Sequence, residues 1–588
     1  MQPQQGEVMM SILRGALLLT TALAGAAIAR PALAQDAGNQ MDAIQAQITQ
    51  LQQELRRMRG ELSARDSQVR AAQNDAARAR AQADRAVTQS QTQGGGQGHA
   101  IQTQGPGQAG TPGMPAQVQA YPGSTSPGPQ TASSASGQSA GTTGPGGSFR
   151  LGGVTVTLGG FLAAEGVYRT RNITADIGSS FGAIPTANSA NYHTGEFRGS
   201  ARQSRISLLA EGQVSPNQKV AGYFETDFLG VGTTSNSFES NSYVPRLRQA
   251  YLTYDNDSFG GHVLLGQSWS LLTLNRIGIT PRQENIPLTI DAQYVPGFNW
   301  KRQWQLRVDK DFLDHRVWLG ASFEEPQTNY YTGPNGLGVA AGTAAITNLG
   351  GSLLNGTNSY SNDIAPDLVV KAAFDPGWGH YELFGLGKLL HDRVSFTGDG
   401  RNNTTVAGGV GGGAILPVVP KKLDFQLSGM AGYGIGTYGS GQLPDAIVSS
   451  TGSPKPLPEY TILAGLVAHP TPLLDIYSYV GTEQISRTSF NLGTRSFGYG
   501  NPLYGDGGCN SELSTLACVA NTSGITQSTI GGWWRFLKGG YGTVQAGAQY
   551  SYTRRDIFPG AGATANTRVS TSTDDNMVLF SFRYLPFQ

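Results

Sequence analysis

From residue 149 to residue 588 the chain alternates apolar and polar positions with a period of two. At its end, Val578, Phe580, Phe582 and Tyr584 alternate with Met577, Leu579, Ser581 and Arg583. Residues 219–228 and 303–309 repeat the pattern, with most of the charge on one face. Successive side chains of a β-strand point to opposite faces. The pattern therefore predicts strands that are apolar on one face and polar on the other.

A soluble β-sandwich would alternate in the same way. Single all-β domains rarely reach the length of residues 149–588, however, and no helical pattern interrupts this stretch. Aromatic residues near the expected strand ends also fit the interface girdles of a membrane barrel. They are Trp300, Trp304, Trp533, Trp534, Tyr550, Tyr552 and Phe587. The fold class predicted is all-β: a transmembrane antiparallel β-barrel.

The strand number follows from length. At roughly 27 residues for each strand with its loop, residues 149–588 provide about 16 strands. Short periplasmic turns are expected at residues 215–218, 255–258, 311–314, 375–378 and 417–420. Residues 326–363 and 485–525 are expected to form extracellular loops. A barrel of this size encloses an aqueous channel, whereas about eight strands would leave none.

The first 34 residues have the order of a secretory signal peptide. Arg14 precedes an apolar run over residues 16–29, and Ala32-Leu33-Ala34 supplies a small-x-small cleavage site. The alternative, a membrane anchor, needs about 20 apolar residues. The run is shorter, so we expect export.

Residues 35–87 predict a periplasmic coiled coil. Apolar residues recur at alternating steps of three and four from Met41 to Ala86, with Arg65 the one break. The other faces are polar, so partner helices and self-association are expected, while the heptads leave the oligomer order open. Residues 88–148 form a Gly/Gln/Ser/Pro tract without periodicity, which is typical of a disordered linker.

Composition narrows the function further. Charged residues make up 14% of the chain, against about 25% in soluble domains, and the net charge of +1 gives no case for nucleic acid. No cofactor, metal cluster or catalytic constellation is indicated, so no enzyme is expected. The two cysteines, Cys509 and Cys518, are nine residues apart and are expected to form a disulfide in an oxidising compartment.

The expected lumen lining carries the candidate functional residues. They are Arg205, Glu225, Asp227, Arg246, Arg248, Lys301 and Arg307. We expect the arginines to form a basic patch, with Glu165, Glu225 and Asp227 facing it across the lumen, an arrangement that would focus permeating ions. The alternative is that these charges are paired for stability.

Residues 268–299 differ from the other connections because they are rich in proline and in apolar side chains. Such a segment is expected to fold into the lumen and narrow it, rather than to form an ordinary extracellular loop. Its charged candidates are Arg276, Arg282, Glu284 and Asp291.

With these residues in view, the chain resembles the DcaP-like porins. The resemblance rests on Leu158-Gly159-Gly160-Phe161, Ala201-Arg202-Gln203-Ser204-Arg205, Arg246-Leu247-Arg248-Gln249-Ala250-Tyr251, Gly266-Gln267-Ser268-Trp269-Ser270 and Ser581-Phe582-Arg583-Tyr584. It implies a 16-stranded barrel, a homotrimer in the outer membrane, a periplasmic coiled coil and a preference for small anions such as dicarboxylates. The long linker and the ending Pro586-Phe587-Gln588 depart from the family pattern.

The function expected is passive diffusion of small hydrophilic solutes through each barrel of a trimer. An alternative remains open, in which the barrel anchors an envelope-tethering protein and the coiled coil contacts peptidoglycan.

Overall fold

The computed structural model of the chain describes residues 147–230, 243–336, 345–347, 349–351, 360–564 and 567–587. The expected signal peptide, coiled coil and nearly all of the expected linker lie outside the described residues. Within the described part, no helix has the length and apolar character needed to cross a membrane.

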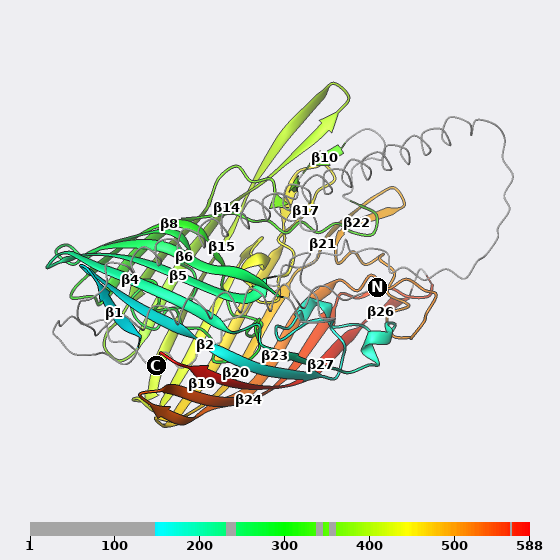
Figure 1. The fold of residues 1–588 in the computed structure, drawn as a ribbon. Helices are drawn as coiled ribbons and strands as arrows, with labels where there is room; N and C mark the ends of the chain where they lie inside the picture. Colours follow the sequence, from blue (N-terminus) through cyan, green and yellow to red (C-terminus); the bar gives the residue numbers. More distant parts are fainter. Residues whose placement is uncertain are drawn as a thin grey trace, which may run out of the picture. The chain divides into compact units, whose positions relative to one another are not determined.

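Sixteen antiparallel strands close into a barrel, which confirms the predicted fold class. They are β2 (Val154–Arg169), β4 (Arg205–Ser215), β5 (Gln218–Gly230), β6 (Val244–Asn256), β7 (Gly261–Trp269), β8 (Arg302–Phe312), β9 (Val317–Glu324), β13 (Asp367–Phe374), β14 (His380–Phe396), β15 (Asp399–Val419), β16 (Leu423–Tyr433), β19 (Pro458–Thr471), β20 (Leu474–Ile485), β23 (Thr522–Gly539), β24 (Gly542–Ile557) and β27 (Ser572–Leu585). The last strand pairs with the first, from Leu162 opposite Tyr584 to Arg169 opposite Met577. Figure 1 shows β27 beside β2 at this seam.

Shorter elements decorate the barrel. Strands β1 (Ser148–Leu151) and β3 (Glu196–Ser200) both pair with β2, and β10 (Ala345–Thr347) pairs with β14. The remaining strands form two-stranded ribbons: β11 (Leu349–Gly351) with β12 (Tyr360–Ser361), β17 (Ala446–Val448) with β18 (Pro454–Pro456), β21 (Thr488–Leu492) with β22 (Arg495–Tyr499), and β25 (Gly560–Ala561) with β26 (Arg568–Val569). Three 3-10 turns, η1 (Phe181–Ala183), η2 (Ala190–Tyr192) and η3 (Gly436–Tyr438), lie in the loops.

The two ends of the barrel differ in their connections. Short turns join β4 to β5, β6 to β7, β8 to β9, β13 to β14 and β15 to β16, all at positions expected from the sequence. Leu585, near the C-terminus, pairs with Thr543 just after another short turn. The opposite ends of the strands carry the long connections, such as residues 486–521, apart from the short turn that joins β14 to β15. This asymmetry is typical of outer-membrane barrels, where short turns face the periplasm.

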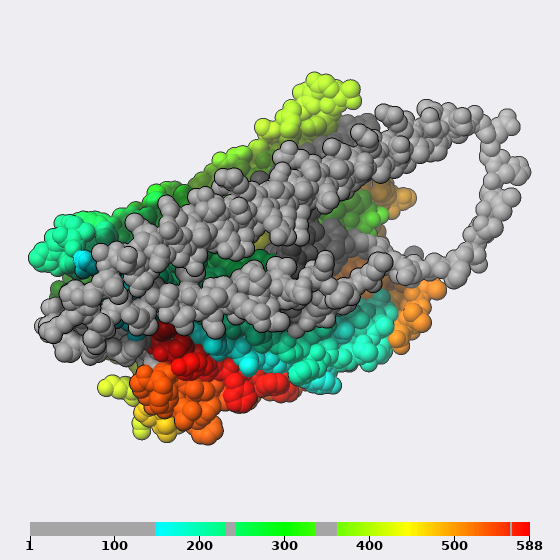
Figure 2. All heavy atoms as spheres, in the orientation of Figure 1, coloured from blue at the N-terminus to red at the C-terminus, as the bar shows by residue number. Residues whose placement is uncertain are grey.

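One hairpin rises well above the rest of the wall. Strand β14 has 17 residues and β15 has 21, whereas about 9–11 residues suffice to cross a bilayer. The hairpin of β14 and β15 therefore extends beyond the membrane on the loop side, as Figures 1 and 2 show in yellow-green.

The outer face of the barrel is apolar. In β27, the exposed fraction is 50% for Val578 and 55% for Phe582, but 0% for Ser581 and 1% for Arg583. Backbone groups are satisfied by neighbouring strands, so a lipid bilayer can cover this surface without leaving unpaired polar groups.

Two of the expected girdle aromatics point the other way. Trp300 and Trp533 are 2% and 0% exposed and lie on the inner side of the wall, whereas Trp534 is 58% exposed. The reason for Trp533 is parity, since neighbouring residues on a strand face opposite sides. Trp300 belongs to a loop that folds inward.

Candidate functional site

The connection between β7 and β8 lies inside the barrel. Two side chains far apart in the sequence donate hydrogen bonds to backbone carbonyls of this loop at 2.8 Å each: Gln203 to Ile290 O, and Trp533 to Leu288 O. On another part of the wall, Lys371 Nζ donates to the Thr273 carbonyl at 2.8 Å. The donors come from the segment before β4, from β23 and from β13, so residues 270–301 cross the lumen. We call this segment the lumen loop.

The lumen loop has an aromatic core. Its residues Tyr294, Phe298 and Trp300 pack with Trp269 at the end of β7, with ring centroids 5.0–6.5 Å apart. Apolar residues of the inner wall join them: Leu463, Val467, Tyr477, Tyr479, Trp533, Met577 and Leu579. Burying a large apolar side chain contributes about 1.5–3 kcal/mol. The loop is thus fixed against the wall formed by β19, β20, β23 and β27.

Two further loops meet the lumen loop, and the sequence did not predict either contact. Trp300 donates its backbone N–H to Tyr438 O and its indole N–H to Ser440 Oγ, at 2.8 and 3.0 Å. Ala292 N donates to Ile177 O at 3.1 Å. The connection at residues 434–457 and the segment around Ile177 therefore also fold inward.

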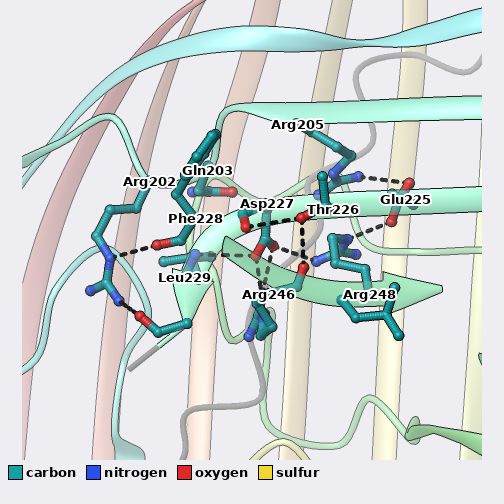
Figure 3. A network of polar contacts seen from close by, with 12 residues as sticks. Arg202, Gln203, Arg205, Glu225, Thr226, Asp227, Phe228, Leu229, Arg246 and Arg248 are labelled. Atoms are coloured by element: carbon teal, nitrogen blue, oxygen red, sulfur yellow. Dashed lines mark hydrogen bonds and ion pairs between the residues drawn. The ribbon is translucent and has the colours of Figure 1, made fainter. Parts of the chain in front are cut away.

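Opposite charges gather on three consecutive strands beside the lumen loop (Figure 3). Arg205 lies on β4, Glu225 and Asp227 on β5, and Arg246 and Arg248 on β6. Arg205 and Arg248 face inward while their chain neighbours Ile206 and Leu247 face outward, as the period-two pattern predicts. We call these five residues the charge cluster.

Asp227 is the most heavily bonded member. Arg246 approaches it with two nitrogens, Nε to Oδ1 at 3.0 Å and Nη2 to Oδ2 at 2.6 Å, and Arg248 Nη1 lies 2.9 Å from Oδ2. Leu229 N donates a fourth contact, to Oδ1, at 3.1 Å. A bidentate arginine and a second guanidinium hold this carboxylate rigidly.

Glu225 is paired more loosely. Arg248 Nε donates to one carboxylate oxygen, and Tyr223 donates its hydroxyl to the other at 3.0 Å. Arg205 Nη1 is 3.7 Å from the same oxygen as Tyr223. Arg205 is therefore held less tightly by the acids than Arg246 and Arg248 are.

The expectation that acids face arginines across the lumen is wrong. Glu225 and Asp227 lie on the strand between the arginine strands, so the pairs are lateral. Glu165 is likewise paired with its neighbour across the seam, with Arg583 Nη2 at 2.6 Å from Oε1. Adjacent antiparallel strands bring side chains of the same face within contact distance, which period-two patterning within one strand does not reveal.

Arg302 joins the charge cluster and was missed by sequence reasoning. It acts electrostatically on both Glu225 and Asp227, and its guanidinium lies 5.1 Å from the Trp269 ring and 5.4 Å from the Trp300 ring. Its position at the first residue of β8 gives it outward parity, which would place it in lipid. Trp269 at the end of β7 and Trp300 of the lumen loop hold it inward instead.

The other pore-lining candidates lie elsewhere. Lys301 faces the Tyr438 ring at 4.9 Å, and Arg307 pairs with Asp309 at 2.8 Å on its own strand. The structure therefore does not bring Lys301 or Arg307 into contact with the charge cluster.

The four charged candidates of the lumen loop serve different contacts. Arg276 and Glu284 belong to a small hairpin closed by the bridge between Asn275 and Glu284. Arg282 donates to the Tyr251 hydroxyl at 3.3 Å. Asp291 accepts from the backbone of Ser179 at 3.0 Å, and burial raises the pKa of its carboxyl above the ordinary value. Asp291 therefore ties the lumen loop to residues 170–204.

The structure joins Cys509 and Cys518 in a disulfide within residues 486–521. Asp506 lies beside it and accepts hydrogen bonds from Val519 N and Ala520 N at 3.0 and 2.8 Å. Burial raises the pKa of Asp506. Asp506 with the two cysteines is the one cluster of potential metal ligands in the described part of the chain, and the disulfide occupies both sulfurs.

Comparison with known proteins yields structural matches. No protein-family model and no curated protein sequence matches the chain. The solved outer membrane channel DcaP of Acinetobacter baumannii is similar over 75% of this chain and 99% of its own length, with 18% identity and a TM-score of 0.51. An anion-selective porin from Comamonas acidovorans covers 74% of this chain and 99% of its own, with 10% identity and a TM-score of 0.40. The trimer form of OmpT from Vibrio cholerae covers the same shares at 11% identity and a TM-score of 0.39. The chain thus has the barrel fold of the DcaP channel, which the sequence resemblance predicts.

Proposed function

We propose that this protein is an outer-membrane porin, and that small hydrophilic solutes, chiefly anions, diffuse passively through each barrel of a homotrimer. The apolar outer face and the short turns at one end support insertion in the outer membrane. The heptads of residues 35–87 support self-association.

The observation that carries the anion preference is the composition of the charge cluster with Arg302. Four guanidinium groups, those of Arg205, Arg246, Arg248 and Arg302, surround the two carboxylates Glu225 and Asp227. The cluster therefore has a surplus of two positive charges. In a lumen with low-dielectric walls, such a surplus raises the local concentration of anions.

The position of the charge cluster supports the same conclusion. The lumen loop fills the side of the barrel lined by β19 to β27, through its aromatic core. It also reaches the strands of the charge cluster, because Arg282 of the loop donates to the Tyr251 hydroxyl on β6 at 3.3 Å. A solute passing the lumen loop therefore travels within the electrostatic field of the charge cluster.

Planar-bilayer recording of the full chain tests the proposal. We expect ion conductance that appears in steps of three, and a reversal potential in a KCl gradient on the anion-selective side. Arg205→Ala should shift the reversal potential toward zero, because Arg205 is the member held most loosely by the acids. Arg198→Ala is the matched control, since Arg198 is 51% exposed on β3. A cation-selective wild type would refute the anion preference, and absence of conductance would refute the porin.

A further inference from the structure

The outer face of the barrel has a hollow on the side of β13 to β19. Two rows of outward residues cross these strands in register, and each is interrupted by residues with little or no side chain. In one row, Leu383 pairs with Gly412, Gly412 with Gly429, and Gly429 with Ile462. The result is an apolar groove of about 920 Å³, which we call the outer groove.

The walls of the outer groove are large apolar side chains. Leu383 is 73% exposed, Phe374 46%, Leu427 42% and Ile462 47%. Two alanines also line it: Ala414 lies two residues from Gly412 on the same strand, and Ala372 lies opposite Leu383 on β13. These exposed side chains are apolar and offer an occupant no hydrogen bonds, so the groove suits a hydrocarbon chain.

The outer groove lies in the half of the barrel nearest the short turns, and its rim has the chemistry of a membrane interface. Trp378, 64% exposed, contacts the ring of the groove residue Tyr381 at 5.2 Å. Exposed tryptophan and tyrosine are found at the level of lipid headgroups. The groove therefore begins at the periplasmic surface of the bilayer and continues into its apolar interior.

The turns just beyond this rim are basic. Lys421 and Lys422 are exposed in the turn between β15 and β16, the strands that form the floor. Arg316 is exposed next to the groove residue Val317, with Asp314 as the exposed acid of that turn. The Asp375 carboxylate of the neighbouring turn is turned to His380 and to Gly278 N. Three cations against one exposed acid complement an anionic headgroup.

We propose that the outer groove is a binding site for an anionic glycerophospholipid of the periplasmic leaflet. An acyl chain lies over Gly412 and Gly429 between Leu383 and Ile462, and the headgroup phosphate contacts Lys421 and Lys422. Ordinary lipid contact would not distinguish this face from the rest of the barrel. Here the glycines and alanines make the groove deep enough for an acyl chain, and the lysines favour an anionic headgroup over a zwitterionic one.

Native mass spectrometry of the full chain in detergent, titrated with phosphatidylglycerol or phosphatidylcholine of the same acyl composition, tests the site. We expect phosphatidylglycerol to be retained at least fivefold more than phosphatidylcholine. Lys421→Glu with Lys422→Glu should abolish this preference and leave phosphatidylcholine retention unchanged. Lys538→Glu, at the exposed end of β23 next to the turn into β24, is the charge control and should keep the preference.

Filling the groove is the second arm. Ala372→Leu with Ala414→Leu should lower retention of both lipids at least fivefold, whereas Ala164→Leu, outward on β2, should not. Equal retention in the filled variant and the wild type would overturn the proposal. Oxidation of a Leu383→Cys variant tests the competing possibility that two copies of the chain meet at this face. Because the native cysteines are bonded to each other, only the new thiol can form an intermolecular disulfide. A disulfide-linked dimer would make this face a subunit interface and would also overturn the lipid site.

Discussion

Arg248 and Asp227 form an ion pair in which neither side chain is exposed to solvent, with Nη1 2.9 Å from Oδ2. Arg248 also pairs with Glu225, so one guanidinium compensates two carboxylates. Arg248 is therefore a structural residue, whereas Arg205, which also faces inward, lies 3.7 Å from its acidic partner and is held more loosely.

We expect Arg248→Met to lower the free energy of unfolding by about 3–5 kcal/mol, because buried Glu225 would lose its main partner and buried Asp227 would lose one of the two arginines paired with it. Arg198→Met is the control: the Arg198 side chain is 51% exposed, and Glu196 would keep its contact with Arg169 at 3.5 Å, so we expect a loss of no more than about 1 kcal/mol. Urea unfolding in lipid vesicles, followed by tryptophan fluorescence, measures both. Equal losses would contradict the interpretation.

Arg302→Gln should reduce anion selectivity by an amount similar to Arg205→Ala. The substitution removes one positive charge next to Glu225 and Asp227, while glutamine keeps a polar group beside Trp269 and Trp300. The measurement is the reversal potential in a KCl gradient. Lys310→Gln, on the same strand but close to Phe312 near the short turn, should leave selectivity unchanged; an equal effect there would mean that total charge, rather than the charge cluster, sets selectivity.

Tyr294 has a left-handed backbone, with φ 69°, and its side chain is fully buried. This conformation costs a non-glycine residue about 1–2 kcal/mol. The free energy of unfolding, measured with urea, should therefore be about 1 kcal/mol higher for Tyr294→Gly than for Tyr294→Ala. Both variants should conduct more than the wild type, because a large ring leaves the lumen.

Phe298 provides the matched comparison. It packs against Tyr294 with ring centroids 5.0 Å apart, but its φ is not positive. Phe298→Gly should be less stable than Phe298→Ala, by about 0.5–1 kcal/mol. The same order of glycine and alanine at both positions would show that the backbone at Tyr294 is not strained.

Reduction of the Cys509–Cys518 disulfide should loosen residues 486–521 without changing conductance. Closing a loop of this length stabilises the folded segment by about 3 kcal/mol in the chain-entropy model. Limited proteolysis should cut this segment at least tenfold faster after reduction, and a Cys509→Ser with Cys518→Ser variant should match the reduced protein. A change in single-channel conductance would instead assign this loop to the pore.

The parity of the wall could be predicted from the sequence because each strand repeats every two residues, as Arg205, Ile206 and Ser207 illustrate. The turn positions followed from proline, asparagine and aspartate between strands. Neighbours across strands could not be predicted, since the pairing of Asp227 with Arg246 depends on the register of two strands, and alternation within one strand carries no register.

The lumen loop was expected from its composition, but its partners were not. The inner wall at Leu463, Tyr479 and Leu579 is apolar because it faces the lumen loop rather than water. A single sequence shows those residues as irregularities in the polar face. Arg302 could not be predicted for a related reason: the rings that hold it inward are those of Trp269, just before the lumen loop, and Trp300, within it.

The hydrogen bonds of the lumen loop to β13, β20, β23 and β24 have a mechanical consequence. A hollow cylinder of sixteen strands flattens easily when the surrounding membrane presses unevenly, whereas a tube with an internal cross-brace keeps its section. The bore of this barrel is then set by the brace, so a change in bilayer tension or thickness would alter the tilt of the wall before it altered the width of the passage.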